Sequence, residues 1–443
     1  MKTPICDFVR RYAGSGAVRL HMPGHKGKAQ LGCEALDITE IPGADVLYAA
    51  RGVIRESEEN ASALFGSART LYSAEGSSLC IRAMLQLAQQ YARLRGRRPL
   101  IAAGRNAHRV FLEGAALLDL PIRWLGCGEE LLSARPVLAE LEALFAGAEV
   151  PAAVYLTSPD YLGNVLDLGP IAALCHENGA LLLVDNAHGA YLRFLDPPRH
   201  PLDRGADLCC DSAHKTLPAL TGSAYLHLAK SCPKELLPMA EQALALFAST
   251  SPSYLILQSL DALNPRLSGE YPARVRRTAE RLDACKAALG AAGWELCGTE
   301  PLKLTLKPKP RGYTGEALAE ALRRAGFVPE FADADHLVLM ATPETSEREL
   351  RAATEVLLAL PARGAIREAP PVRKMAEVVL TPREALLSPF ETVPVERCLG
   401  RVLAATCVGC PPALPIAICG ERLDGTALAL FRYYGVTELN VVL

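Results

Sequence analysis

The chain has 443 residues, of which half are hydrophobic and 22% are charged, and its formal net charge is −2. A chain of this length and composition is globular and exceeds a single hydrophobic core, so we expect two or three domains. The near-neutral charge without a dominant basic block argues against a nucleic-acid partner. The lack of a signal peptide and of a long apolar run argues against a membrane and predicts a cytoplasmic protein.

Short apolar runs alternate with amphipathic stretches between residues 69 and 228. The runs are continuously apolar, which is typical of strands buried on both faces of a mostly parallel sheet covered by helices. Ligands bind at the carboxyl ends of the strands in such sheets, so the residues that follow the runs are candidates for chemistry. We expect strands at 70–74, 100–103, 122–125, 152–157, 181–184 and 223–228, and helices at 79–94, 136–145 and 170–176.

The first candidate is Gly76-Ser77-Ser78, just before the helix expected at 79–94. A glycine and two hydroxyls at a helix N-terminus can bind a phosphate, because the free N–H groups and the helix dipole favour an anion there. The same residues are typical of an ordinary helix cap. The motif alone leaves both interpretations open.

Two further candidates follow expected strands. His108 comes after the run at 100–103 and could lie flat against a cofactor ring or cap a helix from a loop. Asp185 closes the run at 181–184. A buried carboxylate is costly without a charged partner, and a protonated pyridine nitrogen would be such a partner. The alternative for Asp185 is again a helix cap.

The fourth candidate is Ser212-Ala-His214-Lys215-Thr, after an apolar run at 208–210. The amine of Lys215 could form a Schiff base, and Ser212 and His214 could reach a phosphate, although a solvated lysine is the alternative. Taken together, a phosphate loop, a ring stacker, a pyridinium carboxylate and a lysine occur in the order used by pyridoxal 5′-phosphate (PLP) enzymes of the aspartate-aminotransferase fold.

The pattern changes after residue 264. A long amphipathic helix at 274–293 precedes strands at 294–297, 302–306 and 337–340 and helices at 315–324 and 347–360, which indicates a smaller α+β unit. A linker at 361–373 leads to a last segment at 374–443. Cys407 and Cys410 have Cys-x-x-Cys spacing, but no second pair completes a metal site. We therefore expect a role in packing or loop structure, and no metal.

Several longer motifs resemble the prokaryotic ornithine/lysine/arginine decarboxylase family. The most specific are His-Met-Pro-Gly-His-Lys-Gly at 21–27 and Ser-Ala-His-Lys-Thr-Leu-Pro at 212–218. The resemblance extends over nearly the whole chain. Its other segments lie at 37–43, 52–56, 107–108, 185–190, 250–254, 411–415 and 420–421.

The resemblance implies an α/β protein of the type I PLP-dependent transferase fold, with a mostly parallel seven-stranded sheet. It implies an N-terminal arm and major domain at 1–270, a small α+β domain at 271–365 and a C-terminal domain at 366–443. It also implies a homodimer with active sites shared between subunits. Because the motif at 21–27 lies so near the start, the chain resembles a short form without an N-terminal receiver-like domain.

The implied activity is PLP-dependent decarboxylation of arginine, lysine or ornithine to a di- or polyamine precursor. In this family pattern Lys215 forms the Schiff base, and Asp185 pairs with the pyridinium nitrogen. His108 stacks on the ring, and His188 lies near the ring edge. The phosphate is bound by Gly76, Ser77, Ser78, Ser212 and His214.

The substrate residues are implied more loosely. Thr250 and Ser251 belong to a loop that would reach toward the partner subunit's site, as would the loop at 21–27. Glu421 is a candidate for the distal cation of a basic substrate, because a buried cation needs a carboxylate.

Some positions depart from the family pattern. Glu75 replaces an asparagine, Arg109-Val110 replaces Lys-Ser, Asn186 replaces a glutamate, and Gly222 replaces a glutamine. A carboxylate facing a phosphate is unfavourable, so Glu75 should point away. These departures leave the PLP roles in place but put substrate and activity in question.

Two alternatives therefore remain open. One is another type I PLP reaction, such as transamination or elimination. An aminotransferase should hold the substrate carboxylate with an arginine of the small domain, where Arg311, Arg323 and Arg324 are available. The other is a PLP-binding protein without turnover.

Overall fold

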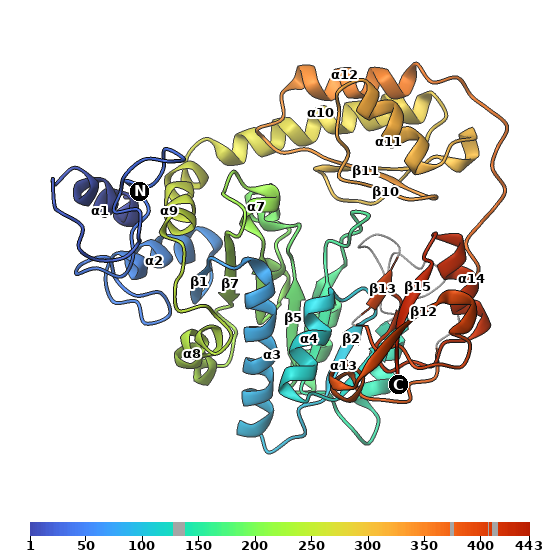
Figure 1. Cartoon of the computed structure of the whole chain (residues 1–443), viewed down its shortest axis with the longest axis horizontal. Helices are drawn as coiled ribbons and strands as arrows, with labels where there is room; N and C mark the ends of the chain where they lie inside the picture. The colour runs from blue at the N-terminus through green and yellow to red at the C-terminus, as the bar shows by residue number, and fades with distance from the viewer. Residues whose placement is uncertain (127–137, 373–375, 406, 410–414) are drawn as a thin grey trace. The chain divides into compact units, whose positions relative to one another are not determined.

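The computed structural model describes residues 1–126, 138–372, 376–405, 407–409 and 415–443 (Figure 1). The chain divides into two compact units. The first comprises Met1–Pro99, Ala152–Val154 and Leu168–Arg274, and the second comprises Leu100–Pro151, Tyr155–Asp167 and Val275–Leu443. None of the described helices is long and apolar enough to cross a membrane. The three-domain division of the chain at 270 and 365 stays a prediction.

A seven-stranded sheet is the largest among the residues that the structure describes. Its strands are β1 (Arg69–Ser73), β2 (Ile101–Gly104), β3 (Ile122–Leu125), β4 (Ala153–Thr157), β5 (Leu181–Asp185), β6 (Leu208–Asp211) and β7 (Ala224–Leu228). Their order is β1-β7-β6-β5-β4-β2-β3. β5 pairs with β6 and β2 with β3 in parallel, whereas β7 is antiparallel to both neighbours. Nearly every residue of β5, β6 and β7 is buried, which explains their continuous apolar sequence. The predicted mostly parallel sheet is confirmed.

Helices of the first unit pack around its strands. They are α1 (Pro4–Ala13), α2 (Val53–Phe65), α3 (Gly76–Leu94), α6 (Leu168–Glu177), η1 (Ala190–Phe194), η2 (Pro201–Arg204), α7 (Ala213–Thr216), η3 (Lys234–Met239), α8 (Ala240–Ala245) and α9 (Tyr254–Ser268). The buried face of α3 packs against β5, β6 and β7. α3 begins at Gly76, three residues earlier than expected, so Ser77 and Ser78 lie in its first turn. The long helix α10 (Tyr271–Ala291) begins in this unit and continues in the second.

One carboxyl group in the first unit makes stability depend on pH. Glu58 of α2 is 3% exposed, and its Oε1 accepts a hydrogen bond of 3.0 Å from the N–H of Tyr72. Burial raises the pKa of Glu58 from 4.5 to about 8. A carboxyl whose pKa is raised by folding stabilises the folded state below its usual pKa, and that contribution is lost as pH rises toward the folded pKa.

As the pH rises between these two pKa values, we expect Glu58 to lower the free energy of unfolding of the wild type by about 1.4 kcal/mol per pH unit. Glu58→Gln should remove this contribution, so the variant should gain stability relative to wild type as the pH rises toward 8. Urea unfolding of both proteins at several pH values measures the difference. Parallel pH profiles for the two proteins would contradict the assignment.

The second unit contains a four-stranded antiparallel sheet in the order β10-β11-β9-β8. Leucines of the strands and helices form its core with Trp294. These strands and helices lie in the stretch where the sequence predicts a small α+β unit, and the bounds of that unit as a domain stay a prediction. Its elements are β8 (Glu295–Cys297), β9 (Lys303–Lys307), η4 (Lys309–Arg311), α11 (Gly315–Arg324), β10 (Phe331–Ala332), β11 (Leu337–Met340) and α12 (Glu347–Leu358). The same unit holds α4 (Arg109–Leu118) and α5 (Leu138–Phe145).

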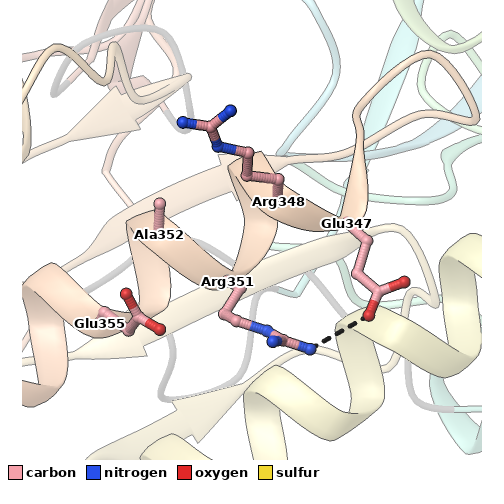
Figure 2. Close-up of a pocket in the computed structure, with 5 residues that line it drawn as sticks. All are labelled: Glu347, Arg348, Arg351, Ala352 and Glu355. Atoms are coloured by element: carbon pink, nitrogen blue, oxygen red, sulfur yellow. Dashed lines mark hydrogen bonds and ion pairs between the residues drawn. The ribbon is translucent and has the colours of Figure 1, made fainter.

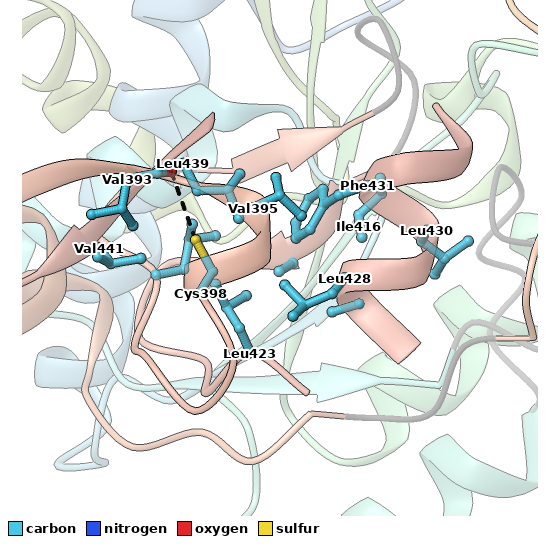
Figure 3. Packing of buried hydrophobic residues seen from close by; sticks show 13 residues of the cluster. Val393, Val395, Cys398, Ile416, Leu423, Leu428, Leu430, Phe431, Leu439 and Val441 are labelled. Carbon is cyan, nitrogen blue, oxygen red and sulfur yellow. Dashed lines mark hydrogen bonds between the residues drawn. The ribbon is translucent and has the colours of Figure 1, made fainter. Parts of the chain in front are cut away.

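The C-terminal segment forms a separate hydrophobic cluster around Phe431, Val395 and Leu430 (Figure 3). Two two-stranded sheets flank it, β12 with β15 and β13 with β14. Cys407 lies in β13, whereas Cys410 and residues 411–414 lie outside the described residues. The elements are α13 (Pro382–Leu387), β12 (Phe390–Pro394), η5 (Val395–Arg397), β13 (Cys407–Gly409), β14 (Pro415–Ile418), α14 (Gly425–Tyr433) and β15 (Glu438–Val442).

Candidate active site

Two glycines shape the turn that starts α3. Gly76 has a φ of +69°, and its N–H donates a hydrogen bond of 2.7 Å to the carbonyl of Gly222. Gly222 has a φ of +96°, and a Cβ at this position would lie 3.1 Å from the carbonyl oxygen of Ala74. A left-handed backbone in such close contact favours glycine. The departure from the family pattern at position 222 therefore follows from the geometry of this turn.

Hydroxyl groups from two elements meet beside this turn. Ser212, which is buried after β6, donates a hydrogen bond of 2.9 Å from Oγ to Oγ of Ser77 in α3. The imidazole of His214 lies 4.0 Å from the point that a Cβ on Gly76 would occupy. Two hydroxyls, an imidazole and the N-terminus of a 19-residue helix thus converge. This donor set suits a phosphate.

The proton on His214 can be assigned from its partner. Nδ1 lies 2.9 Å from the carbonyl oxygen of Ser223, which only accepts, so Nδ1 carries the hydrogen and Nε2 remains for a ligand. Burial lowers the pKa of His214, and the charge of Lys215 lowers it further. The imidazole is therefore neutral at pH 7, and a bound phosphate dianion would raise its pKa again.

The amine of Lys215 has a histidine neighbour. Lys215 lies in the short helix α7 and is half-buried, and its Nζ is 3.1 Å from Nε2 of His188. At this distance the two groups share a hydrogen bond, and one proton can pass between them. Neither the Schiff-base role of Lys215 nor the ring-edge role of His188 is tested by this contact, and both stay predictions.

Asp185 ends β5 and is 3% exposed. Its Oδ1 accepts a hydrogen bond of 3.1 Å from the N–H of Ala187, and the thiol of Cys210 on β6 donates to the same oxygen at 3.7 Å. The carboxylate is thus held at the carboxyl end of a buried strand, where the sequence placed it. Its partnership with a pyridinium nitrogen stays a prediction.

His108 is the N-cap residue of α4, and its Nδ1 accepts a hydrogen bond of 3.3 Å from the N–H of Val110. The capping role that the sequence left open is therefore present. Its side chain is exposed in the chain by itself. Stacking on a cofactor ring stays a prediction for this residue.

Glu421 has a partner that the sequence analysis did not foresee. Its carboxylate forms a bidentate pair with Arg105, with distances of 2.5 Å and 3.1 Å, and it also accepts the N–H of Ile418. Arg105 and Glu421 are each 1% exposed. A substrate cation would have to compete with this arginine, so the structure favours an anchoring role for Glu421 between β14 and the segment before His108.

We expect Glu421→Gln to lower the free energy of unfolding by about 3–5 kcal/mol, because it leaves the charge of Arg105 buried without its counter-ion. The double variant Arg105→Met/Glu421→Leu should lose less, because it removes both charges. Urea unfolding of the three proteins measures the effect. A stable Glu421→Gln protein with a raised KM for basic amino acids alone would instead support the substrate role.

Thr250 and Ser251 lie in an exposed connection between α8 and α9. The N–H of Ser251 donates to Oγ of Ser249 at 3.1 Å, and the N–H of Ser249 donates to Oε1 of Glu75 at 2.8 Å. Glu75, which departs from the family pattern, is the N-cap residue of α3, and its side chain thus links this connection to the start of that helix. A contact between Thr250 or Ser251 and a substrate stays a prediction.

The three arginines considered for a substrate carboxylate have other contacts. Arg311 donates to the carbonyls of Ala292 and Leu360 and stacks 4.6 Å from the ring centroid of Trp294. Arg323 and Arg324 both donate to exposed Glu320. Arg311 is therefore engaged in packing, and no described contact singles out the other two as a clamp.

An open pocket of about 460 Å³ lies along α12. Its lining consists of Glu347, Arg348, Arg351, Ala352 and Glu355, and Figure 2 shows Arg351 turned toward Glu347, 3.2 Å away. The lining belongs to a single charged helix and includes none of the residues predicted from the sequence. We assign it no role in the chemistry.

The first unit offers groups suited to each part of PLP. The turn at Gly76 has room beside His214 and presents the hydroxyls of Ser77 and Ser212 for a phosphate. Lys215 offers a primary amine, and Asp185 offers a buried carboxylate. These residues fit the cofactor.

Known proteins resemble the chain over most of its length. Residues 140–289 match the family model described as "Orn/Lys/Arg decarboxylase, major domain". The chain is 30% identical to the uncharacterized protein YaaO of Bacillus subtilis, covering 96% of this chain and 92% of that protein. It is 27% identical to an arginine decarboxylase of the same organism, covering 95% and 91%. The solved constitutive lysine decarboxylase of E. coli has a TM-score of 0.80 at 17% identity, with 100% of this chain and 82% of that chain covered.

Proposed function

Because the chain belongs to the ornithine/lysine/arginine decarboxylase family and has the type I PLP-enzyme fold, we propose that it catalyses PLP-dependent decarboxylation of a basic amino acid. The observation that carries the proposal is the arrangement within the first unit. Lys215 lies 3.1 Å from His188, Asp185 is buried at the end of β5, and Ser212 is bonded to Ser77. The product would be a di- or polyamine precursor in polyamine biosynthesis in the cytoplasm.

Bound PLP supplies an electron sink for the electron pair left when carbon dioxide departs. Lys215 would hold the cofactor through its amine. Asp185 would keep the ring nitrogen protonated through its negative charge. Ser77, Ser78, Ser212 and His214 would hold the phosphate, and the family resemblance implies that the imidazole of His108 would stack on the ring.

The pair of Lys215 and His188 handles the proton. The amine of Lys215 lies 3.1 Å from the imidazole of His188. Either group can return a proton to the α-carbon of the product, and the hydrogen bond between them lets the other restore it.

We extend the proposal to a homodimer with shared active sites. The segment that contains the motif at 21–27 exposes Val18, Leu20, Met22 and Leu31, each between 70% and 90% accessible in the chain alone. Apolar side chains gathered on one segment are typical of a surface that another chain covers. Sedimentation equilibrium should give twice the chain mass. A monomer that is fully active would contradict the shared site.

The experiment that tests the function measures carbon dioxide and amine from arginine, lysine, ornithine and neutral amino acids, with PLP supplied. Amine from one basic substrate supports the proposal and names the substrate. If PLP binds but none of the amino acids loses carbon dioxide, the decarboxylase proposal fails, and the remaining explanations are another PLP reaction or a protein without turnover.

A further inference from the structure

A second carboxylate, Asp211, ends β6 directly before Ser212 and is completely buried. Nε2 of His200 lies 3.0 Å and Nε2 of His227 lies 3.1 Å from its Oδ2. Nδ2 of Asn186 donates to its Oδ1 at 2.6 Å. None of these contacts belongs to the roles assigned above.

The partners of the two histidines place their protons. Nδ1 of His200 accepts the N–H of Leu202 at 3.4 Å, so Nε2 carries the hydrogen and donates to Asp211. Nδ1 of His227 lies 2.8 Å from the hydroxyl of Thr70, which can donate to it. With Nδ1 accepting from Thr70, Nε2 of His227 carries a hydrogen and also donates to Asp211. Burial lowers the pKa of His227.

Asp211 itself remains charged. Burial opposes its ionisation, but the two histidines outweigh that effect and hold its pKa well below the usual range. A single buried anion is thus stabilised by three N–H donors, from His200, His227 and Asn186. Removing one donor from such a network is costly, because the charge cannot reach water.

A metal ion is a poorer explanation of the same cluster. Cys209, His200 and Asp211 have ligand atoms within 4.8 Å of one another. Burial, however, raises the pKa of the Cys209 thiol far above its usual range, and metals bind the thiolate. Nε2 of His200, the nitrogen that faces the cluster, already carries a proton. The contacts therefore describe a hydrogen-bonded network.

Asn186 connects this network to the candidate site. It is completely buried and directly follows Asp185, and its own N–H donates to the carbonyl of Cys210 at 3.0 Å. Its carbonyl accepts the N–H of Gly189 at 2.8 Å and so closes the turn that carries His188. The bond from its side chain to Asp211 thus fixes a turn with one candidate cofactor residue at each end.

We propose that Asp211 is a positioning residue, which acts through Asn186 to hold Asp185 and His188 in the geometry that PLP requires. The inference rests on the proposed function for the identity of the cofactor. It also accounts for the departure at position 186, because an amide there donates to Asp211, whereas the glutamate of the family pattern would place two carboxylates together.

The test is a charge swap. Asn186→Asp puts a carboxylate opposite Asp211 and should raise the dissociation constant of PLP from the apoprotein at least tenfold. It should also lower kcat with a smaller change in KM. The double variant Asn186→Asp/Asp211→Asn restores one donor and one acceptor, and it should recover most of the PLP affinity. Asn186→Ala, which only removes the donor, serves if the first variant does not fold.

Asp207→Asn is the matched control. Asp207 is also buried and directly precedes β6. It accepts the N–H of Leu182 and lies 3.1 Å from Nε2 of His176, but no described contact joins it to Asn186. It should lower the melting temperature of the apoprotein without changing PLP affinity. PLP affinity within twofold of wild type in the folded position-186 variants, or no rescue in the double variant, would overturn the inference.

The outcome of the charge-swap experiment can be distinguished from the outcome of the decarboxylation assay. A wild-type protein that binds PLP but releases no carbon dioxide defeats the decarboxylase proposal and leaves the affinity measurements intact. A wild-type protein that does not bind PLP defeats both.

Discussion

Lys215→Ala should abolish the visible absorption of PLP bound as a Schiff base and reduce decarboxylation to background. The side chain provides the only chemical group at this position that can hold the cofactor covalently, and alanine removes it while keeping α7 intact. His188 also loses its partner at 3.1 Å, so no neighbouring amine takes over the proton. Absorbance spectra and a carbon dioxide assay with the preferred substrate measure the two losses.

Two controls make this result specific. Lys215→Arg keeps a positive charge but cannot form the Schiff base, so it should lose the band as well. Lys230→Ala, at an exposed lysine, should keep both the band and the activity. Borohydride reduction of the wild type should place the stable adduct on the peptide that contains Lys215. An adduct on another lysine would refute the central assignment.

The location of the candidate residues could be predicted because ligands of parallel sheets bind at the carboxyl ends of the strands. Asp185 and Lys215 each follow a continuous apolar run, and both runs are strands of the large sheet. Local sequence also predicted the helix after Gly76, since glycine and hydroxyl residues mark helix starts. Most helix and strand ends differ from the expected ones by only a few residues, as is usual when tertiary contacts set the ends.

Contacts between distant segments could not be predicted in this way. Arg105 and Glu421 are separated by 316 positions, and Ser249 and Glu75 by 174. No local pattern distinguishes a buried arginine from an exposed one, and the partner is fixed only when the C-terminal segment packs in its own unit. For that reason the sequence made Glu421 a candidate for binding a substrate cation, whereas in the structure its carboxylate binds Arg105.

The same reason explains why Asp211 was overlooked. It stands in an apolar run beside the more conspicuous Lys215 motif. Its histidine partners are the N-cap residue of η2 and a residue of β7. The available signal was the cost of a carboxylate within a continuously buried strand. The same cost, which predicts a charged partner for Asp185, applies equally to Asp211, where hydrogen-bonded histidines take the place of a cofactor.

Asp185→Asn should separate charge from structure at the candidate cofactor site. The amide oxygen can still accept the N–H of Ala187, now at 3.1 Å, so the turn is preserved, but the negative charge that keeps the ring nitrogen protonated is lost. We expect kcat to fall by roughly 10²–10³, the loss typical when a preorganised electrostatic group is removed. Because the carboxylate would act on the ring nitrogen of the cofactor and not on the substrate, KM should change less.

Asp185→Ala should do more, because it also removes the acceptor for Ala187 and leaves a gap at the end of β5. PLP should then dissociate faster, and the rate should fall further than in the asparagine variant. Dialysis against buffer without PLP, followed by absorbance, measures retention, and assays at saturating PLP measure the chemical step. If kcat of Asp185→Asn is unchanged at saturating PLP, the carboxylate has no part in the chemistry and serves only as a hydrogen-bond acceptor for the turn. If kcat falls while the contact with Ala187 is kept, the loss is due to the missing charge.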